Sequence, residues 1–292
     1  MKKYSKNKLL FKNYLKYLII ILFIIIVIGI AFVAYIKINN VIEFTNVDKS
    51  AMNISDEKAK LSTPIIVNNI VLGGVYKSEW VSTARYYNMS DFKKDIELRF
   101  YGKEGSSGVF TLLEVGKSLS NIIGLTDTTN TINEYVGIIN EEQLSYIPLI
   151  SKSEDIDSNK YNDKIKEVLG VYNIFNNSVN INKVHECYIN NTDKATILEV
   201  TSNSNGNASG AYSAIIMIDN TGKAYLLKYN YVHNKEKAED FKIYSVKFVI
   251  DLNDDGINEI ITSGTDEFET MYSVLEFKKS KFVEVLSESL KN

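Results

Sequence analysis

The sequence predicts a mainly β extracytoplasmic domain behind a single N-terminal membrane-spanning helix. Three observations support this fold class. Residues 17–36 form an uninterrupted apolar run. From residue 63 onward, short segments rich in apolar and β-branched residues recur between turn residues, which is typical of β-strands. Two similar segments in residues 179–292 indicate repeated four-stranded, blade-like units, and a single helix is expected before them.

The apolar run has the length and composition of a transmembrane helix. At about 1.5 Å per residue, twenty helical residues span roughly the 30 Å hydrocarbon core of a bilayer. Fifteen of the twenty are Leu, Ile, Phe or Val, and none is charged. A cleaved signal peptide usually has an apolar region of 7–15 residues followed by a small-residue cleavage site. The longer run predicts an uncleaved signal-anchor.

Lysines before the run predict its orientation. Residues 1–16 contain six lysines and no acidic residue. The positive-inside rule therefore places this basic tail in the cytoplasm and residues 37–292 outside the membrane. The lipid bilayer is thus one expected partner, through residues 17–36.

Composition narrows the function classes. Residues 37–292 carry 27 basic and 36 acidic residues, a net charge of −9, which argues against nucleic-acid binding. Cys187 is the single cysteine, so an intramolecular disulfide is excluded. Abundant Ile, Lys, Asn and Tyr with two prolines are typical of an AT-rich bacterial genome.

The ectodomain is predicted to have four parts. Residues 37–62 are polar and are interpreted as a juxtamembrane spacer. Residues 63–150 form a β-rich unit, with strands expected at 65–72, 97–101, 109–115 and 134–139, and a bend at Gly73-Gly74. Residues 151–178 form a helical connector, because Tyr161, Ile165 and Leu169 recur every fourth residue after a capping Asp157 or Ser158.

The fourth part, residues 179–292, contains the internal repeat. KVHECYINNTDKATILEV (183–200) aligns with KFVIDLNDDGINEIITSG (247–264) at a spacing of 63 residues. Strands are expected at 181–189, 196–202, 211–218 and 223–229, and again at 244–250, 259–263, 271–277 and 281–286. Two such units cannot close a propeller, which needs at least four blades. Stacked sheets, a contribution from the first β unit and oligomerisation all remain open.

One segment of the second repeat has the pattern of a metal-binding loop. In DLNDDGINE, the residues Asp251, Asn253, Asp255 and Glu259 supply side-chain oxygens at positions 1, 3, 5 and 9. The backbone carbonyl of Ile257 is expected at position 7. Hard oxygen donors in this number favour Ca²⁺ over Zn²⁺. An EF-hand is excluded, because position 12 is Thr262 and the flanking segments are β.

The segment resembles the calcium loop of FG-GAP/VCBS-type repeats, the integrin-like blade family, whose signature is D-x-[DN]-x-D-G-x-x-[DE]. The resemblance is close over the loop and its two strands and looser over residues 179–292. It implies the same five residues as calcium ligands. A Phe-Gly/Gly-Ala-Pro segment does not precede the loop. The first repeat has Tyr188, Asn190, Thr192 and Thr196 at the aligned positions, and no metal is expected there.

Catalytic signatures are weaker than the metal pattern. HExxH, G-x-S-x-G, P-loop and CxxC motifs do not occur in the sequence. His185 and Cys187 share one face of a predicted strand, and a half-buried strand face is favoured over a nucleophile pair. We therefore expect a non-enzymatic binding module at a bacterial surface, with a surface protein or wall glycan as partner. The alternatives are a membrane-tethered hydrolase of wall polymer and the external part of an envelope signalling complex.

Overall fold

The computed structural model describes residues 63–76, 78–83, 97–103, 105, 107–115, 122–126, 134–138, 147–174, 178–202, 210–232 and 241–291. All of them belong to one unit of the chain, Asn46–Asn292. Among them, no helix is long and apolar enough to cross a bilayer. The predicted basic tail, the membrane span at 17–36 and the spacer at 37–62 lie outside the described residues.

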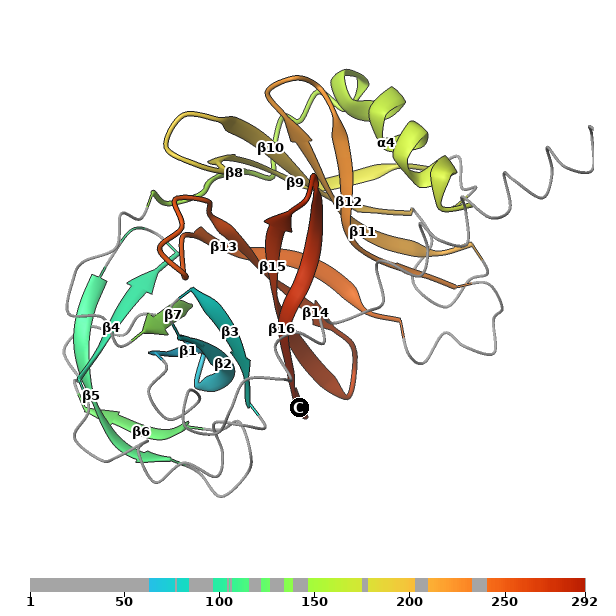
Figure 1. Cartoon of the computed structure of the whole chain (residues 1–292). Coiled ribbons are helices and arrows are strands. Elements are labelled where there is room, and N and C mark those ends of the chain that lie inside the picture. The colour runs from blue at the N-terminus through green and yellow to red at the C-terminus, as the bar shows by residue number, and fades with distance from the viewer. Residues whose placement is uncertain are drawn as a thin grey trace, which may run out of the picture. The chain divides into compact units, whose positions relative to one another are not determined.

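Three antiparallel sheets and one long helix make up the described structure, which confirms the mainly β fold class (Figure 1). The first sheet has the order β3-β2-β1-β7-β4-β5-β6. Its strands are β1 Thr63–Val67, β2 Ile70–Tyr76, β3 Glu79–Ser82, β4 Glu97–Gly102, β5 Ser107–Val115, β6 Ile122–Thr126 and β7 Tyr135–Ile138. The strands expected at 97–101 and 109–115 are confirmed as β4 and β5, which pair antiparallel.

The prediction of the first strand was wrong in one respect. Residues 65–72 are not one strand, because Asn68 and Asn69 form a two-residue turn with φ of 46° and 67°. Val67 pairs with Ile70 across this turn. Asn tolerates the left-handed region that such tight hairpins require. Gly73 and Gly74, expected in a bend, instead lie inside β2.

The second sheet has the order β12-β11-β10-β9-β8 and carries the helix. Its elements are β8 Ile150–Lys152, α4 Asn159–Val171, β9 Asn180–Tyr188, β10 Lys194–Thr201, β11 Tyr212–Asp219 and β12 Ala224–Tyr231. The predicted helix is confirmed, with Ile165 and Leu169 buried on its inner face. Because β8 pairs with β9, the expected boundary at residue 150 falls inside this sheet.

The third sheet is a four-stranded meander with the order β13-β14-β15-β16. Its strands are β13 Ile243–Ile250, β14 Glu259–Thr265, β15 Glu269–Lys278 and β16 Lys281–Lys291. The eight strands expected in residues 179–292 are therefore all present, within a few residues of their predicted ends. A two-residue turn, Lys279-Ser280, closes the β15–β16 hairpin, with φ angles of 52° and 64°.

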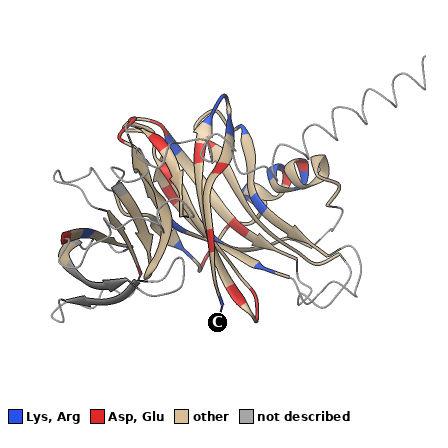
Figure 2. Cartoon of the chain, turned by 60° about the horizontal axis from the view of Figure 1, so that its bottom comes forward, with Lys and Arg blue, Asp and Glu red and all other residues tan. Residues whose placement is uncertain are grey.

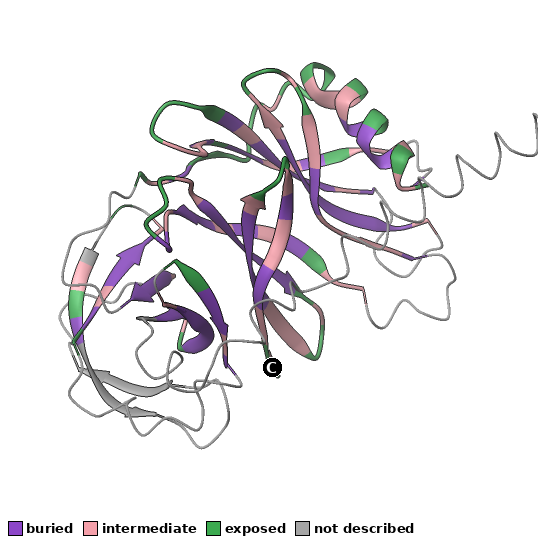
Figure 3. Cartoon of the chain, viewed as in Figure 1, coloured by how far each residue is buried: buried purple, intermediate pink, exposed green. Residues whose placement is uncertain are grey.

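Both faces of the third sheet are buried. One face shares an apolar cluster with the first sheet, in which Phe248 and Leu286 pack with Ile65 and Trp80. The other face shares a cluster with the second sheet, through residues such as Val246 and Ile197. Helix α4 covers the remaining face of the second sheet. Figure 3 shows the buried residues running along the strands, with exposed residues at the hairpin turns and on the helix.

Candidate metal-binding site

The predicted loop connects β13 to β14, as expected, and Ile250 pairs with Glu259 across its base. Its polar side chains hold the backbone of the loop. Asp251 accepts hydrogen bonds from the N–H groups of Asp255 (3.2 Å) and Gly256 (2.8 Å). Asn253 Oδ1 accepts from the Asp255 N–H at 3.1 Å. The chain reverses through Asp254 and Gly256, with φ of 58° and 82°.

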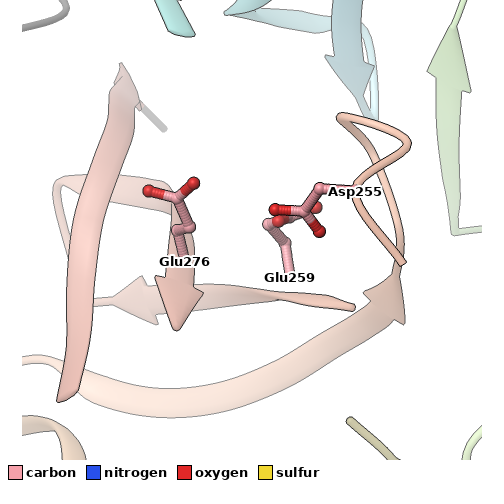
Figure 4. A group of neighbouring side chains, drawn as sticks. All are labelled: Asp255, Glu259 and Glu276. Carbon is pink, nitrogen blue, oxygen red and sulfur yellow. The ribbon is translucent and has the colours of Figure 1, made fainter. Parts of the chain in front are cut away.

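Three carboxylates converge beside this loop. The structure brings Asp255 and Glu259 together with Glu276 of β15, and one oxygen of each lies within 4.8 Å of the others (Figure 4). Asn253 joins the group, because its Nδ2 donates to Asp255 Oδ2 at 3.2 Å and reaches Glu276 Oε1 at 3.5 Å. Like charges at this distance repel, and Lys278 Nζ, which lies 3.5 Å from Glu276 Oε2, offsets part of this charge. A bound cation or a proton would stabilise the rest of the cluster.

Glu259 is the buried centre of the cluster. Its side chain is fully buried, and Oε2 accepts a hydrogen bond from the Leu252 N–H at 2.8 Å. Its other oxygen, Oε1, is buried and has no hydrogen-bond partner among the described residues. Burial raises the pKa of this carboxyl to about 9, and the negative charges of Asp255 and Asp251 act in the same direction. A buried carboxylate oxygen without a donor fits a cation ligand.

Two of the five predicted ligands lie outside the carboxylate group. Asp251 faces the loop amides, and burial raises its pKa. Ile257 lies opposite Asn190 in an isolated antiparallel bridge. Glu276 is the residue that the sequence motif missed. The signal for it was a carboxylate inside an apolar strand, in the segment SVLEF, where Glu276 is 7% exposed. Such a residue normally needs a charged or coordinating partner.

The loop also contacts both other sheets. The Asn258 N–H donates to the Ile189 carbonyl at 2.6 Å, and its side-chain amide donates to the Tyr188 carbonyl at 2.8 Å. The Ser78 hydroxyl, in the turn before β3, donates to the Asn253 carbonyl at 3.0 Å. A cation that fixes this loop would therefore also fix contacts at the end of β9 and at the β2–β3 turn.

The aligned loop of the first repeat has a different organisation. Asn190 Oδ1 accepts from the N–H groups of Thr192 (2.9 Å) and Asp193 (2.7 Å), and its amide donates to Asp193 at 2.7 Å. The Ile189 N–H then closes the turn on the Asp193 carbonyl at 2.9 Å. The polar groups of this tight turn bond to one another, and Asn220 of the β11–β12 turn donates to Asp193 Oδ1 at 3.1 Å.

The two residues considered for nucleophilic chemistry are both buried on one strand face. Cys187 Sγ contacts the Ala195 carbonyl at 3.7 Å, and burial raises the pKa of its thiol to about 12. The thiol is therefore protonated at neutral pH. His185 makes no pair with it, because its ring nitrogens bond to Ser151 and Glu199.

Comparisons of the chain with protein-family models, with curated proteins and with solved structures find no match. Figure 2 shows acidic and basic residues interspersed along the strands and on the helix. The acidic cluster is thus a local feature of the loop and β15.

Proposed function

We propose that this protein is a membrane-anchored, extracytoplasmic binding or interaction protein of a bacterium, stabilised by a structural Ca²⁺ ion. The proposal of a calcium ion rests on Oε1 of Glu259, which is buried without a hydrogen-bond partner among the described residues and lies beside Asp255 and Glu276. Carboxylate and amide oxygens in this number are the ligands that Ca²⁺ takes in proteins. The apolar run at residues 17–36 and the lysines before it support the membrane anchor.

The FG-GAP/VCBS-type resemblance supports the same proposal. The loop lies between the first and second strands of a four-stranded antiparallel meander, and a second meander packs on it. The ion's role is structural: it offsets most of the negative charge of Asp255, Glu259 and Glu276 and holds the loop against Tyr188 and Ser78. A surface protein or wall glycan is the proposed partner of the domain held in this way.

Calcium is expected to stabilise residues 46–292 against thermal unfolding. Extracellular calcium sites typically have dissociation constants of about 10⁻⁴ to 10⁻³ M. At about 10 mM Ca²⁺ this corresponds to roughly 1.4–2.7 kcal/mol, or about 3–10 °C in Tm. Asp255→Ala should abolish the rise relative to chelator. Asp193→Ala, in the aligned loop of the first repeat, should retain it.

The calcium proposal would be overturned by an unchanged Tm in calcium for the wild-type domain. An equal calcium response in the Asp255→Ala variant would also overturn it, since that response would then come from another part of the chain. Mg²⁺ at the same concentration is the ion control, because it demands a smaller, stricter octahedral geometry. We expect Mg²⁺ to give the smaller shift.

The membrane topology has a separate test. Alkaline phosphatase folds actively only after export, so a fusion after residue 292 is expected to be active in bacterial cells. A fusion after residue 16, before the apolar run, is expected to be inactive. Activity of the first fusion should be lost when residues 17–36 are deleted. An inactive but stably produced fusion at residue 292 would contradict the proposed orientation.

A further inference from the structure

A hydrogen-bonded chain of three side chains crosses neighbouring strands of the second sheet, away from the acidic loop. The Ser151 hydroxyl of β8 lies 2.7 Å from His185 Nδ1 of β9. His185 Nε2 lies 2.9 Å from Glu199 Oε1 of β10. Ser151 and His185 are direct cross-strand partners, so the register of the sheet fixes the contact between them.

The contacts of Glu199 determine which histidine nitrogen carries the proton. Glu199 Oε1 accepts a hydrogen bond from the Val246 N–H at 2.7 Å, so this oxygen is an acceptor. It therefore takes the His185 Nε2–H as its second donor. In the neutral imidazole Nδ1 is then the acceptor, and the Ser151 hydroxyl donates to it. This is the arrangement by which a carboxylate orients a histidine as a general base for a serine.

The three side chains differ in exposure to solvent in the way that an activated serine requires. His185 is fully buried and Glu199 is 4% exposed, so water does not compete for their hydrogen bond. Ser151, in contrast, is exposed on β8, which is an edge strand of the sheet. The one member of the chain that an external molecule can reach is thus the nucleophile. An edge strand also presents outward-facing backbone N–H groups, which can donate to a developing oxyanion.

We infer that Ser151 is a base-activated nucleophile that hydrolyses carboxylic esters. Ser151 Oγ would bond to the carbonyl carbon while its proton passes to His185 Nδ1. The tetrahedral intermediate would then expel the alcohol, which takes that proton, and leave Ser151 acylated. Water, deprotonated by His185, would attack the acyl carbon and release the carboxylic acid. The proton returns to Ser151 Oγ, and no oxidant, reductant or cofactor is needed.

Exposed apolar residues lie beside Ser151. Ile147 and Ile150 are 51% and 59% exposed. Together with Pro148 and Tyr161 they line a pocket of about 400 Å³. Ser151 does not line this pocket, because Ile150 and Ser151 are adjacent in β8 and face opposite sides of the strand. The pocket therefore suits an apolar part of the substrate away from the ester bond.

The test uses the full-length protein with a biotinylated fluorophosphonate and with p-nitrophenyl butyrate. Mass spectrometry is expected to find the phosphonate on Ser151, and Ser151→Ala should abolish both labelling and ester hydrolysis. Ser153→Ala, an exposed serine two residues away, should leave both unchanged. Glu199→Gln should lower both rates, because its amide oxygen can keep the place of Oε1 between the Val246 N–H and His185 Nε2 but stabilises the imidazolium less than a carboxylate does.

A folded wild-type protein without label on Ser151 would overturn the inference. Wild-type rates in a folded Glu199→Gln variant would also overturn it, since the relay would then be irrelevant to reactivity. The activity is independent of the acidic loop, so the Asp255→Ala variant is expected to keep it in chelator. Loss of the calcium response and loss of ester hydrolysis therefore report on separate sites.

Discussion

Glu259→Gln is expected to remove the calcium response and, in chelator near pH 8, to make the protein more stable than the wild type. The carboxyl of Glu259 is fully buried with one unpaired oxygen. A glutamine has the same shape and no charge. Its carbonyl can accept from the Leu252 N–H, and its amide can donate to the carboxylates of Asp255 and Glu276. The glutamine therefore gives the unpaired position a hydrogen bond, but it removes a carboxylate ligand of the proposed calcium ion.

The pH dependence follows from the same carboxyl. The pKa of Glu259 is raised from 4.5 to about 9 in the folded protein, so without metal the folded state binds a proton that the unfolded state releases above pH 4.5. Stability from this group is present at low pH and is lost as pH rises toward about 9, by up to about 1.4 kcal/mol per pH unit. Calcium is expected to reverse this trend, because a metal ion binds the ionised carboxylate and releases the proton.

Denaturant unfolding at pH 6, 7 and 8 measures these effects directly. In chelator, the wild type should lose stability over this range, whereas Glu259→Gln should lose less. In calcium, only the wild type should gain stability. A matched change at Glu288→Gln, whose pKa is also raised by burial but which lies outside the cluster, should leave the calcium response intact. Equal calcium stabilisation of wild type and Glu259→Gln would contradict the assignment of Glu259 as a ligand.

Strand periodicity and turn residues predicted the C-terminal half of the fold well. The two meanders were predictable because their turns contain residues suited to tight reversals, as at Asp219-Asn220-Thr221-Gly222. The strand order of the first sheet was harder to predict. Strand β7 inserts between β1 and β4, and this long-range pairing has no local signal. The Asn68-Asn69 turn was hidden because the residues on both sides form one apolar run.

The residues of the two proposed sites differ in the same way. The polar side chains of the loop could be singled out from the sequence because one short segment supplies them in a fixed spacing. Glu276 follows them by seventeen residues or more along the chain and reaches the site only through the pairing of β14 with β15. Ser151, His185 and Glu199 come from three strands, and the sequence gives no spacing rule for such a set. Their meeting depends on the register of β8 against β9 and of β9 against β10.

The largest loss of stability is expected from a substitution far from either site, Gly73→Ala in β2. Gly73 has φ of +136°, which residues with a Cβ rarely adopt. An added Cβ would lie 2.3 Å from the Val81 carbonyl oxygen and 2.8 Å from Leu286 Cδ2. The carbonyl belongs to the paired strand β3, and Leu286 packs from β16 of the third sheet. Neither the strand nor the sheet contact can move without loss of pairing or packing.

We expect Gly73→Ala to lower the free energy of unfolding by about 3–5 kcal/mol, from backbone strain together with overpacking. The matched control is Gly222→Ala, which also has a positive φ, +81°, but has no atom within 4 Å of the added Cβ. It isolates the backbone cost and should lose only about 1 kcal/mol. Chemical denaturation of both variants measures the two losses of unfolding free energy. Equal losses would mean that the first and third sheets do not meet at Gly73 and Leu286. A loss confined to Gly73→Ala would instead locate the contact that holds the first sheet against the meander of β13–β16.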